Sequence, residues 1–514
     1  MELKKTVCYE DFGAVGDGKT DDFDAIKRAH EYANEKGLDV KTDDTKTYYI
    51  GDLGIDEKTK KPATIIKTNV DWGKSNFIID DSRITSDMPS RTGMLFKVER
   101  EHETLVYTPE NDTPNAAIAR INAEGGFKAD IKKFDIGLGY AAMLFVRNDN
   151  RRIYIRYGPN KNDGEGQNDM IVVDKDGNID KDTPFLFDFA AITSITAVRI
   201  DDTPITMKGG IFTTIANQAK EDYRYYSRGI SVGRSNVTVE NITYKIVGEG
   251  EHGDPYTAFL DVNRAANVVI QDSTFQAHKY YMCMGSGGSM VGMGTYAISA
   301  HDSNNVIWRR CTQSNFFADD GKSYRRSVWD IMGSGGCKNL TYEDSVLSRL
   351  DAHGGMYNAK ILNTTIATIA LGGGGDCIIE NCHVYCGSLI EMRADYGSSW
   401  NGKIHVKNVT LHSSASPTLF RCGWFNHDFG YETHIPEEII IDGLKLTTPN
   451  DINIFPARYI EQIAHAHLDE IDGKPNLNKT TPPKRIIVRN NTDGYKYILP
   501  DTEFFSGTEL IIED

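Results

Sequence analysis

Acidic residues recur in this 514-residue chain at the centre of short apolar segments. The segments are Phe259-Leu-Asp261-Val, Val328-Trp-Asp330-Ile, Arg349-Leu-Asp351-Ala and Leu389-Ile-Glu391-Met. In a strand with a two-residue alternation, the apolar neighbours point inward and the carboxylates outward. If the segments stack about 4.8 Å apart, Asp330 and Asp351 are near neighbours, and Asp261 and Glu391 lie about two coils away.

Paired carboxylates suit acid–base chemistry, because like charges held close raise the pKa of one and leave an acid beside a base. Hydrolysis of a glycosidic bond needs such a pair, about 5–5.5 Å apart for retention or about 6.5–9.5 Å for inversion. We expect Asp330 and Asp351 to be this pair. Glu391 is a further catalytic candidate, and Asp261 is a reserve candidate that we expect to bind substrate. The plainer interpretation is a solvated acidic face balanced by arginines.

Basic residues accompany these carboxylates and allow a rival chemistry. His353 and Arg349 share the face of Asp351, and Arg393 shares that of Glu391, so these three residues are expected to orient substrate or tune the carboxylates. Further candidates for substrate binding are Lys322, Arg325 and Trp329. A lyase would instead neutralise a uronate with Ca²⁺ or arginine and use arginine or lysine as the base for β-elimination. Asp319-Asp320-Gly321-Lys322 is a possible calcium loop, but Asp-Gly favours a plain turn.

Composition limits the class of protein. The formal charge of −16 argues against nucleic acid as the partner. The eight cysteines form no CxxC pair and have no histidine at a zinc-like spacing, so we expect free, mostly buried thiols in a reducing compartment, with no metal and no cofactor. No apolar run is long enough to span a bilayer, and no signal peptide is visible. We expect a cytoplasmic protein without a membrane partner, or a secreted one if a leader was removed.

The opening segment carries the most specific motif of the chain. It reads Asp11-Phe-Gly-Ala-Val-Gly-Asp-Gly-Lys-Thr-Asp-Asp22, followed by apolar residues at helical spacing from Phe23 to Ala29. Thr20, Asp21 or Asp22 can cap this helix and Gly37 can end it. The string resembles the start of the pectate-lyase superfamily, and Thr47–Ile50 resembles the strand that follows there. The resemblance implies an all-β fold, a single-stranded right-handed parallel β-helix, whose end this segment caps without taking part in chemistry.

A short strand ending in a polar turn residue recurs along the chain, as a β-helix requires. An asparagine often precedes the strand, and stacked amides could form ladders there. The strands begin at Val237, Val268, Val306, Leu340, Ala359, Cys377, Ile404 and, more loosely, Ile440, and the asparagines are Asn236, Asn267, Asn305 and Asn339. The uneven intervals place loops, and with them the active-site groove, across roughly residues 250–400.

The pattern divides the chain into four segments. Residues 1–93 form the cap and first coils, and 94–197 a β-rich insertion that resembles a small sandwich. Residues 198–445 form the main β-helix with the groove, and 446–514 the C-terminal coils and cap, with a helix near Tyr459–Ala466.

Within the superfamily, polygalacturonase-like hydrolases carry an Asp pair, a Gly-His-Gly and an Arg-Ile-Lys. Asp319-Asp320, Ala352-His353-Gly354 and Met392-Arg393-Ala394 occur in a similar order, but the spacing and flanking residues differ, so no catalytic role is carried over. We expect a glycoside hydrolase acting on a poly- or oligosaccharide. The alternatives are a uronate lyase and a non-catalytic glycan-binding or tailspike-type module. A homotrimer is one assembly that this fold allows.

Overall fold

The computed structural model describes residues 6–51, 63–84, 93–220, 225–326, 328, 331–413, 417–423, 427–476 and 478–513, with the backbone alone at 331–334. The chain divides into two compact units. Unit 1 comprises Met1–His102, Ile200–Gly333 and Ser345–Ser348, and unit 2 comprises Glu103–Arg199, Ser334–Asp344 and Arg349–Asp514.

Unit 1 begins with the predicted cap. Helix α1 (Phe23–Lys36) has Asp22 at its N-cap position and ends at Gly37, whose φ of 63° is left-handed. The carboxylate of Asp22 accepts hydrogen bonds from the backbone N–H groups of Val15 and Gly16, which fixes the glycine-rich entry loop to the helix start. The buried face of α1 consists of Phe23, Ala25, Ile26, Ala29, His30 and Ala33. The cap, the helix and strand β4 (Thr47–Ile50) were all predicted from the opening motif, and all three are confirmed.

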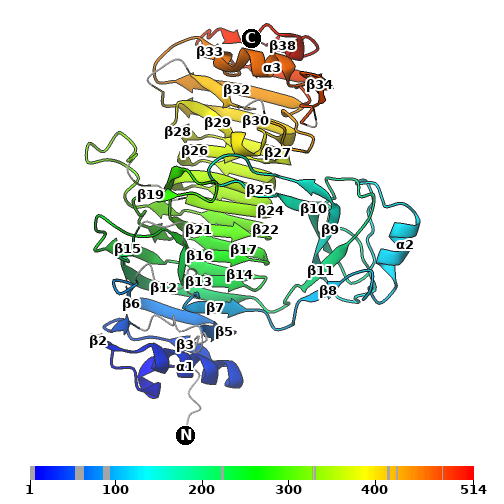
Figure 1. The fold of residues 1–514 in the computed structure, drawn as a ribbon. Helices are drawn as coiled ribbons and strands as arrows, with labels where there is room; N and C mark the ends of the chain where they lie inside the picture. The colour runs from blue at the N-terminus through cyan, green and yellow to red at the C-terminus, as the bar shows by residue number, and fades with distance from the viewer. Residues whose placement is uncertain are drawn as a thin grey trace. The chain divides into compact units, whose positions relative to one another are not determined.

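Each regular coil of unit 1 contains three strands, which pair in parallel with those of the next coil (Figure 1). Along the second strand, for example, Val237 pairs with Val268 and Val268 with Val306. The three ladders are β13 (Tyr226–Gly233), β16 (Tyr256–Asn263) and β21 (Tyr296–His301); β14 (Val237–Glu240), β17 (Ala266–Gln271) and β22 (Asn304–Arg309); and β15 (Thr243–Val247), β18 (Thr274–Phe275) and β23 (Thr312–Gln313).

Shorter strands complete unit 1. The first coils contain β1 (Thr6–Val7), β2 (Asp17–Asp21), β3 (Asp39–Lys41), β5 (Thr64–Ile66), β6 (Val70–Asp80), β7 (Phe96–Glu99) and β12 (Ile205–Ile215). An antiparallel hairpin, β19 (Tyr281–Met284) with β20 (Met290–Met293), projects from the coils. Aromatic rings fill the first coils, where the ring of Phe77 stacks on Phe212 at 4.7 Å.

The turns explain the recurring asparagines. Asn236, Asn267 and Asn305 have φ between 53° and 59°, a left-handed conformation that asparagine adopts more readily than other residues with a Cβ. The amide of Asn267 donates to Asn236 and that of Asn305 to Asn267, at 3.1 and 2.8 Å. In unit 2, a second ladder of side-chain hydrogen bonds runs through Asp344, Asn363, Asn381 and Asn408. The predicted amide ladders are therefore confirmed.

Unit 2 contains the insertion. Strands β8 (Leu105–Tyr107), β9 (Ala142–Ile153), β10 (Glu165–Val173) and β11 (Ser194–Arg199) form one antiparallel sheet, and α2 (Ala117–Ala123) contributes to its apolar core. The insertion is thus a single sheet rather than the expected sandwich. It was predicted to begin at residue 94, whereas β7 pairs with coil strands and the insertion's own sheet starts at Leu105.

The coils of unit 2 continue to the end of the described chain. One ladder runs from Cys377 through Ile404, Ile439 and Ile486 to Leu510, so parallel pairing persists beyond residue 445. The predicted helix near Tyr459–Ala466 is present as α3 (Ile460–His465). The coil strands are β26 (Thr365–Leu371), β27 (Gly373–Glu380), β28 (His383–Val384), β29 (Ser388–Met392), β30 (Trp400–Leu411), β31 (Thr418–Arg421), β32 (Glu438–Leu446), β33 (Ile452–Asn453), β36 (Arg485–Arg489), β37 (Tyr497–Ile498) and β38 (Glu509–Ile512), with a hairpin of β34 (Glu470–Ile471) and β35 (Lys474–Pro475); β24 (Ile331–Glu343) and β25 (Val346–Leu362) cross the division between the units.

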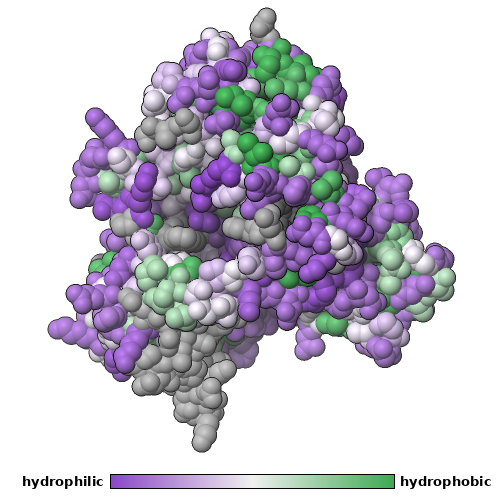
Figure 2. Space-filling model, turned by 45° about the horizontal axis from the view of Figure 1, so that its top comes forward, coloured by the Kyte–Doolittle hydropathy of each residue, from purple (hydrophilic) through white to green (hydrophobic). Residues whose placement is uncertain are grey.

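The predicted all-β, right-handed parallel β-helix is confirmed by these ladders. The eight cysteines all lie among the described residues and are free thiols, six of them buried. Within the described ranges, no helix combines the length and apolar character needed to cross a bilayer. Figure 2 shows a face that is mostly hydrophilic, with hydrophobic residues gathered in separate patches.

Candidate functional site

Asp261 and Glu391 have no carboxylate beside them on the neighbouring strands. Asp261 in β16 lies between Ser231 and Ser299, and Glu391 in β29 lies between Ala370 and Arg421. The coils that contain β21 and β26 follow Asp261 and precede Glu391, which fits the expected separation of about two coils from the predicted pair. Asp330 and Trp329 lie outside the described residues.

Asp351 instead lies at the centre of a network of cations in unit 2. Its Oδ1 accepts hydrogen bonds from Arg393 Nη1 at 2.5 Å and from Arg349 Nη2 at 3.3 Å. Its Oδ2 is 3.6 Å from Nε2 of His353. The side chain is only 4% exposed. The three basic residues that were expected to accompany the carboxylates therefore all contact Asp351.

Arg393 connects this carboxylate to a second one. Its Nε and Nη2 donate to the two oxygens of Asp395 at 2.8 and 2.7 Å, and its Nη1 also donates to the Ala352 carbonyl and to His353 Nε2. Gly372 lies beside Arg393 in the coil between, where a Cβ would meet the Cβ of Arg393 at 3.5 Å, an ordinary contact distance.

The insertion supplies another cation to the same network. Arg156, which follows β9, donates from Nε to Asp395 Oδ2 at 2.7 Å, and the backbone N–H of Tyr157 donates to the Asp395 carbonyl. The guanidinium carbons of Arg156 and Arg393 lie 5.5 and 5.2 Å from the ring centre of Tyr396, within cation–π range. Sequence reasoning missed the roles of Arg156 and Asp395.

The surroundings of Asp351 and His353 shift the pKa values of both side chains. Burial alone would raise the pKa of Asp351, but the guanidiniums of Arg349 and Arg393 outweigh burial and hold that pKa well below its usual range. Burial lowers the pKa of His353 to about 3. Asp351 is therefore not the member of the expected pair whose pKa is raised, because its described neighbours are cations. Near neutral pH, Asp351 is ionised and His353 is neutral.

Glu391 is held more loosely than Asp351. Its Oε1 accepts a hydrogen bond from Arg421 Nη1 at 2.8 Å, and no contact of its Oε2 is found among the described residues. The side chain is 20% exposed, while that of Arg421 is largely exposed. Glu391 is thus a carboxylate with one oxygen anchored by Arg421 on a partly exposed side chain.

The sequence of this chain resembles that of a curated phage protein over part of its length. No protein-family model matches the chain. Among curated proteins, a KL64-specific capsule depolymerase of a Klebsiella phage is 29% identical over 139 residues, which is 24% of this chain and 14% of that protein. The match thus covers well under two thirds of the relative.

Solved structures with similar backbones include the tailspike protein gp49 of Pseudomonas phage LKA1, at 11% identity and a TM-score of 0.43, covering 87% of this chain and 82% of that one. Another is a hyperthermoactive exopolygalacturonase of Thermotoga maritima, at 10% identity and a TM-score of 0.34, covering 99% and 91%.

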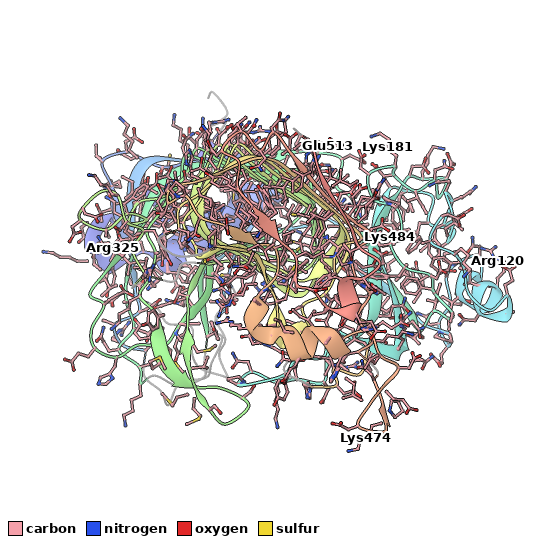
Figure 3. All side chains as sticks on the ribbon, turned by 90° about the horizontal axis from the view of Figure 1, so that it is seen from above. Arg120, Lys181, Arg325, Lys474, Lys484 and Glu513 are labelled. Atoms are coloured by element: carbon pink, nitrogen blue, oxygen red, sulfur yellow. The ribbon has the colours of Figure 1, made fainter. Side chains whose placement is uncertain are left out.

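The remaining predicted site residues belong to unit 1. Asp261 accepts a hydrogen bond from Ser299 Oγ at 2.6 Å and lies 3.7 Å from His301 Nε2. Asp320 accepts hydrogen bonds from the backbone N–H groups of Lys322 and Ser323, which form the turn expected at Asp319–Lys322. Arg325 pairs with Asp319 and projects outward in Figure 3.

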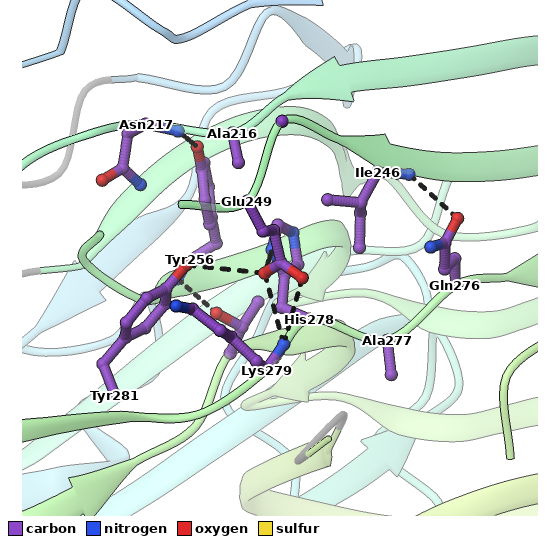
Figure 4. Close-up of polar contacts among 12 residues, drawn as sticks. Ala216, Asn217, Ile246, Glu249, Tyr256, Gln276, Ala277, His278, Lys279 and Tyr281 are labelled. Atoms are coloured by element: carbon purple, nitrogen blue, oxygen red, sulfur yellow. Dashed lines mark hydrogen bonds and ion pairs between the residues drawn. The ribbon is translucent and has the colours of Figure 1, made fainter. Parts of the chain in front are cut away.

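Unit 1 also contains a polar cluster that sequence reasoning missed (Figure 4). Glu249 Oε1 is 3.0 Å from Nδ1 of His278, whose Nε2 is 3.0 Å from the hydroxyl of Tyr244. Glu249 also accepts hydrogen bonds from the backbone N–H of Lys279 and from the Tyr281 hydroxyl. His278 is fully buried and Glu249 is partly exposed, and their contacts tie the loop before β19 to the coils.

Proposed function

We propose that this protein cleaves an acidic polysaccharide and that the arginine network of unit 2 binds an anionic sugar. The observation that carries the proposal is the set of guanidiniums from Arg156, Arg349 and Arg393 around two carboxylates and the ring of Tyr396.

Charge favours an anionic ligand at this place. Three arginines against Asp351 and Asp395, with His353 neutral, give a local charge of +1 in a chain whose formal charge is −16. Arg156 and Arg349 are partly exposed, and guanidinium groups bind carboxylates in a planar, bidentate manner.

Hydrolysis is the first candidate reaction. It requires an ionised carboxylate as nucleophile or base and a second, protonated carboxyl group as the acid. Glu391 suits the first role, because Arg421 anchors its Oε1 and the side chain is 20% exposed. Asp351 is better suited to positioning, since its oxygens are occupied by Arg349 and Arg393. Asp330 remains our candidate for the acid.

Elimination is a second candidate, favoured by the same arginines. A uronate lyase must neutralise the sugar carboxylate before a base removes the neighbouring proton. Arg393 and Arg156 supply positive charge for that purpose. Arg349 is the candidate base that the sequence offers in this network.

The test is incubation with a panel of neutral and uronate-containing polysaccharides, following new reducing ends and absorbance at about 235 nm, where an unsaturated uronate from β-elimination absorbs. New reducing ends without absorbance support hydrolysis, and absorbance supports elimination. Cleavage restricted to acidic glycans supports the arginine network as the binding site. Cleavage of neutral glycans alone would contradict that assignment.

Two variants separate the roles. Glu391→Gln should lower the rate of hydrolysis roughly 100-fold or more, because a reacting carboxylate is lost. Glu380→Gln is the matched control, since Glu380 also pairs with one cation, Lys407, on another strand of the coils. Arg393→Lys keeps the charge but loses the bidentate geometry, so KM should rise for acidic substrates. Binding without any cleavage would favour a glycan-binding module.

A further inference from the structure

Two histidines of unit 2 face each other at a place that the proposed function does not use. His383 lies in β28, and His412 directly follows β30. Nδ1 of His383 is 3.0 Å from Nε2 of His412. The ring centres are 5.3 Å apart and the ring planes are inclined by 40°.

Coil stacking brings this pair together and orients it. Val384 of β28 pairs with Leu411 of β30, and both side chains are buried, so the residues next to them point outward. The ring of Tyr385 stacks on that of His412 at 4.0 Å and 4°, and the His412 backbone N–H donates to the Val384 carbonyl at 2.7 Å. His412 is therefore held in place, whereas His383 is exposed and its ring can turn.

The separation of the nitrogens matches that of two ligands on one metal ion. Two nitrogens bound at about 2.0 Å lie about 2.9 Å apart when they subtend 90° at the metal, and about 3.3 Å apart at a tetrahedral angle. The observed 3.0 Å is closer to the first value. Right-angled nitrogen and oxygen ligation is the geometry that Cu²⁺ and Ni²⁺ prefer, and imidazole is a good ligand for both.

We propose that His383 and His412 form a two-histidine site for a divalent copper or nickel ion, with water at the remaining positions. A small turn of the His383 ring points both lone pairs at one ion, and the ion would link the coil of β28 to that of β30. The two histidines are 29 positions apart in the sequence, so no short sequence motif indicates this site.

The test uses the full chain without an affinity tag, stripped of metal by a chelator and titrated with Cu²⁺ under electron paramagnetic resonance. We expect one equivalent of copper with splitting from two imidazole nitrogens. His383→Asn and His412→Asn should each weaken binding at least about tenfold and remove one nitrogen from the signal. His102→Asn, at an exposed histidine elsewhere, should leave copper binding unchanged.

A second measurement covers the case of a variant that folds poorly. Thermal unfolding of the unaltered chain should shift to higher temperature with Ni²⁺ and not with Mg²⁺, because only the former binds imidazole well. The proposal is overturned if copper gives no two-nitrogen signal, or if that signal survives in either histidine variant. An unchanged unfolding temperature with Ni²⁺ would also overturn it.

Discussion

Replacing Asp351 by asparagine is the sharpest test of the ion network in unit 2. The amide has nearly the shape of the carboxylate, so the change removes charge with little change in volume. In the folded chain, Oδ1 of Asp351 faces Arg393 at 2.5 Å and Arg349 at 3.3 Å, and the side chain is almost fully buried. In Asp351→Asn, the guanidiniums of Arg349 and Arg393 would face a neutral amide oxygen in place of the negatively charged carboxylate.

The cost can be estimated from these contacts. Removing one partner of a buried ion pair typically costs about 3–5 kcal/mol. Here Arg393 keeps its two bonds to Asp395, and Arg349 is partly exposed to water, which reduces the penalty. We therefore expect Asp351→Asn to lower the free energy of unfolding by about 2–3 kcal/mol near neutral pH.

The pH dependence has a definite sign. Burial would raise the pKa of Asp351, but the two arginines hold it well below its usual range, while in the unfolded chain it is about 3.9. The unfolded chain therefore takes up the proton first as the pH falls. The contribution of Asp351 is fully present above about pH 5 and is lost on acidification below about pH 4.

Urea unfolding followed by circular dichroism at pH 7, 5 and 3.5 measures both effects. Asp376→Asn is the control, because Asp376 is an exposed carboxylate in β27 of the same unit. The difference between the unaltered chain and Asp351→Asn should be equal at pH 7 and 5 and smaller at pH 3.5. A loss below about 0.5 kcal/mol at pH 7, or one that grows on acidification, would refute the buried network.

Three other variants test separate features. Burial lowers the pKa of His353 to about 3. Acidification from pH 6.5 to 5 should therefore lower the free energy of unfolding by about 2 kcal/mol more in the unaltered chain than in His353→Gln, as measured by urea unfolding. Lys338→Met leaves Asp169 buried without its cation, since both side chains are 0% exposed, and should cost about 3–5 kcal/mol; adding Asp169→Asn should recover part of this loss in thermal unfolding. Asn363→Ala, at a φ of 49°, should cost about 1–2 kcal/mol in urea unfolding, and Asn363→Gly less, because glycine adopts that angle without strain.

Each of these has a contrary outcome. Equal acid sensitivity with and without His353 would show that this ring is not kept neutral by burial. A further loss on adding Asp169→Asn to Lys338→Met would mean that the aspartate is needed for its backbone hydrogen bonds rather than for its charge. Equal costs for the alanine and glycine changes would mean that backbone strain does not explain Asn363.

The coils could be predicted because their constraints are local. The bend at the start of each recurring strand needs a left-handed residue, and asparagine at Asn236, Asn267 and Asn305 satisfies that need while the amides of Asn267 and Asn305 bond to the coil before. The opening motif likewise determines its own loop, since Asp22 binds backbone groups only six and seven residues away. Patterns of this kind repeat in sequence as they repeat in space.

The site was only partly predictable because its contacts are not local. Arg349, His353 and Arg393 were expected beside acidic residues, and all three contact Asp351. Arg156 was missed because 239 residues separate it from Asp395, and the insertion that carries it leaves the coil pattern altogether. No periodicity in the sequence indicates which insertion residue reaches the coils.

Side-chain length explains why arginines rather than stacked carboxylates make up the network. The chain completes the coil containing β26 between Asp351 and Arg393, so a contact between these residues must cross that coil. A carboxylate is too short to do so, whereas the longer side chain of Arg393 reaches Asp351. In a β-helix, acidic residues at similar positions therefore meet only when their coils are adjacent. Long cations are the better sequence signal for contacts between coils that are further apart.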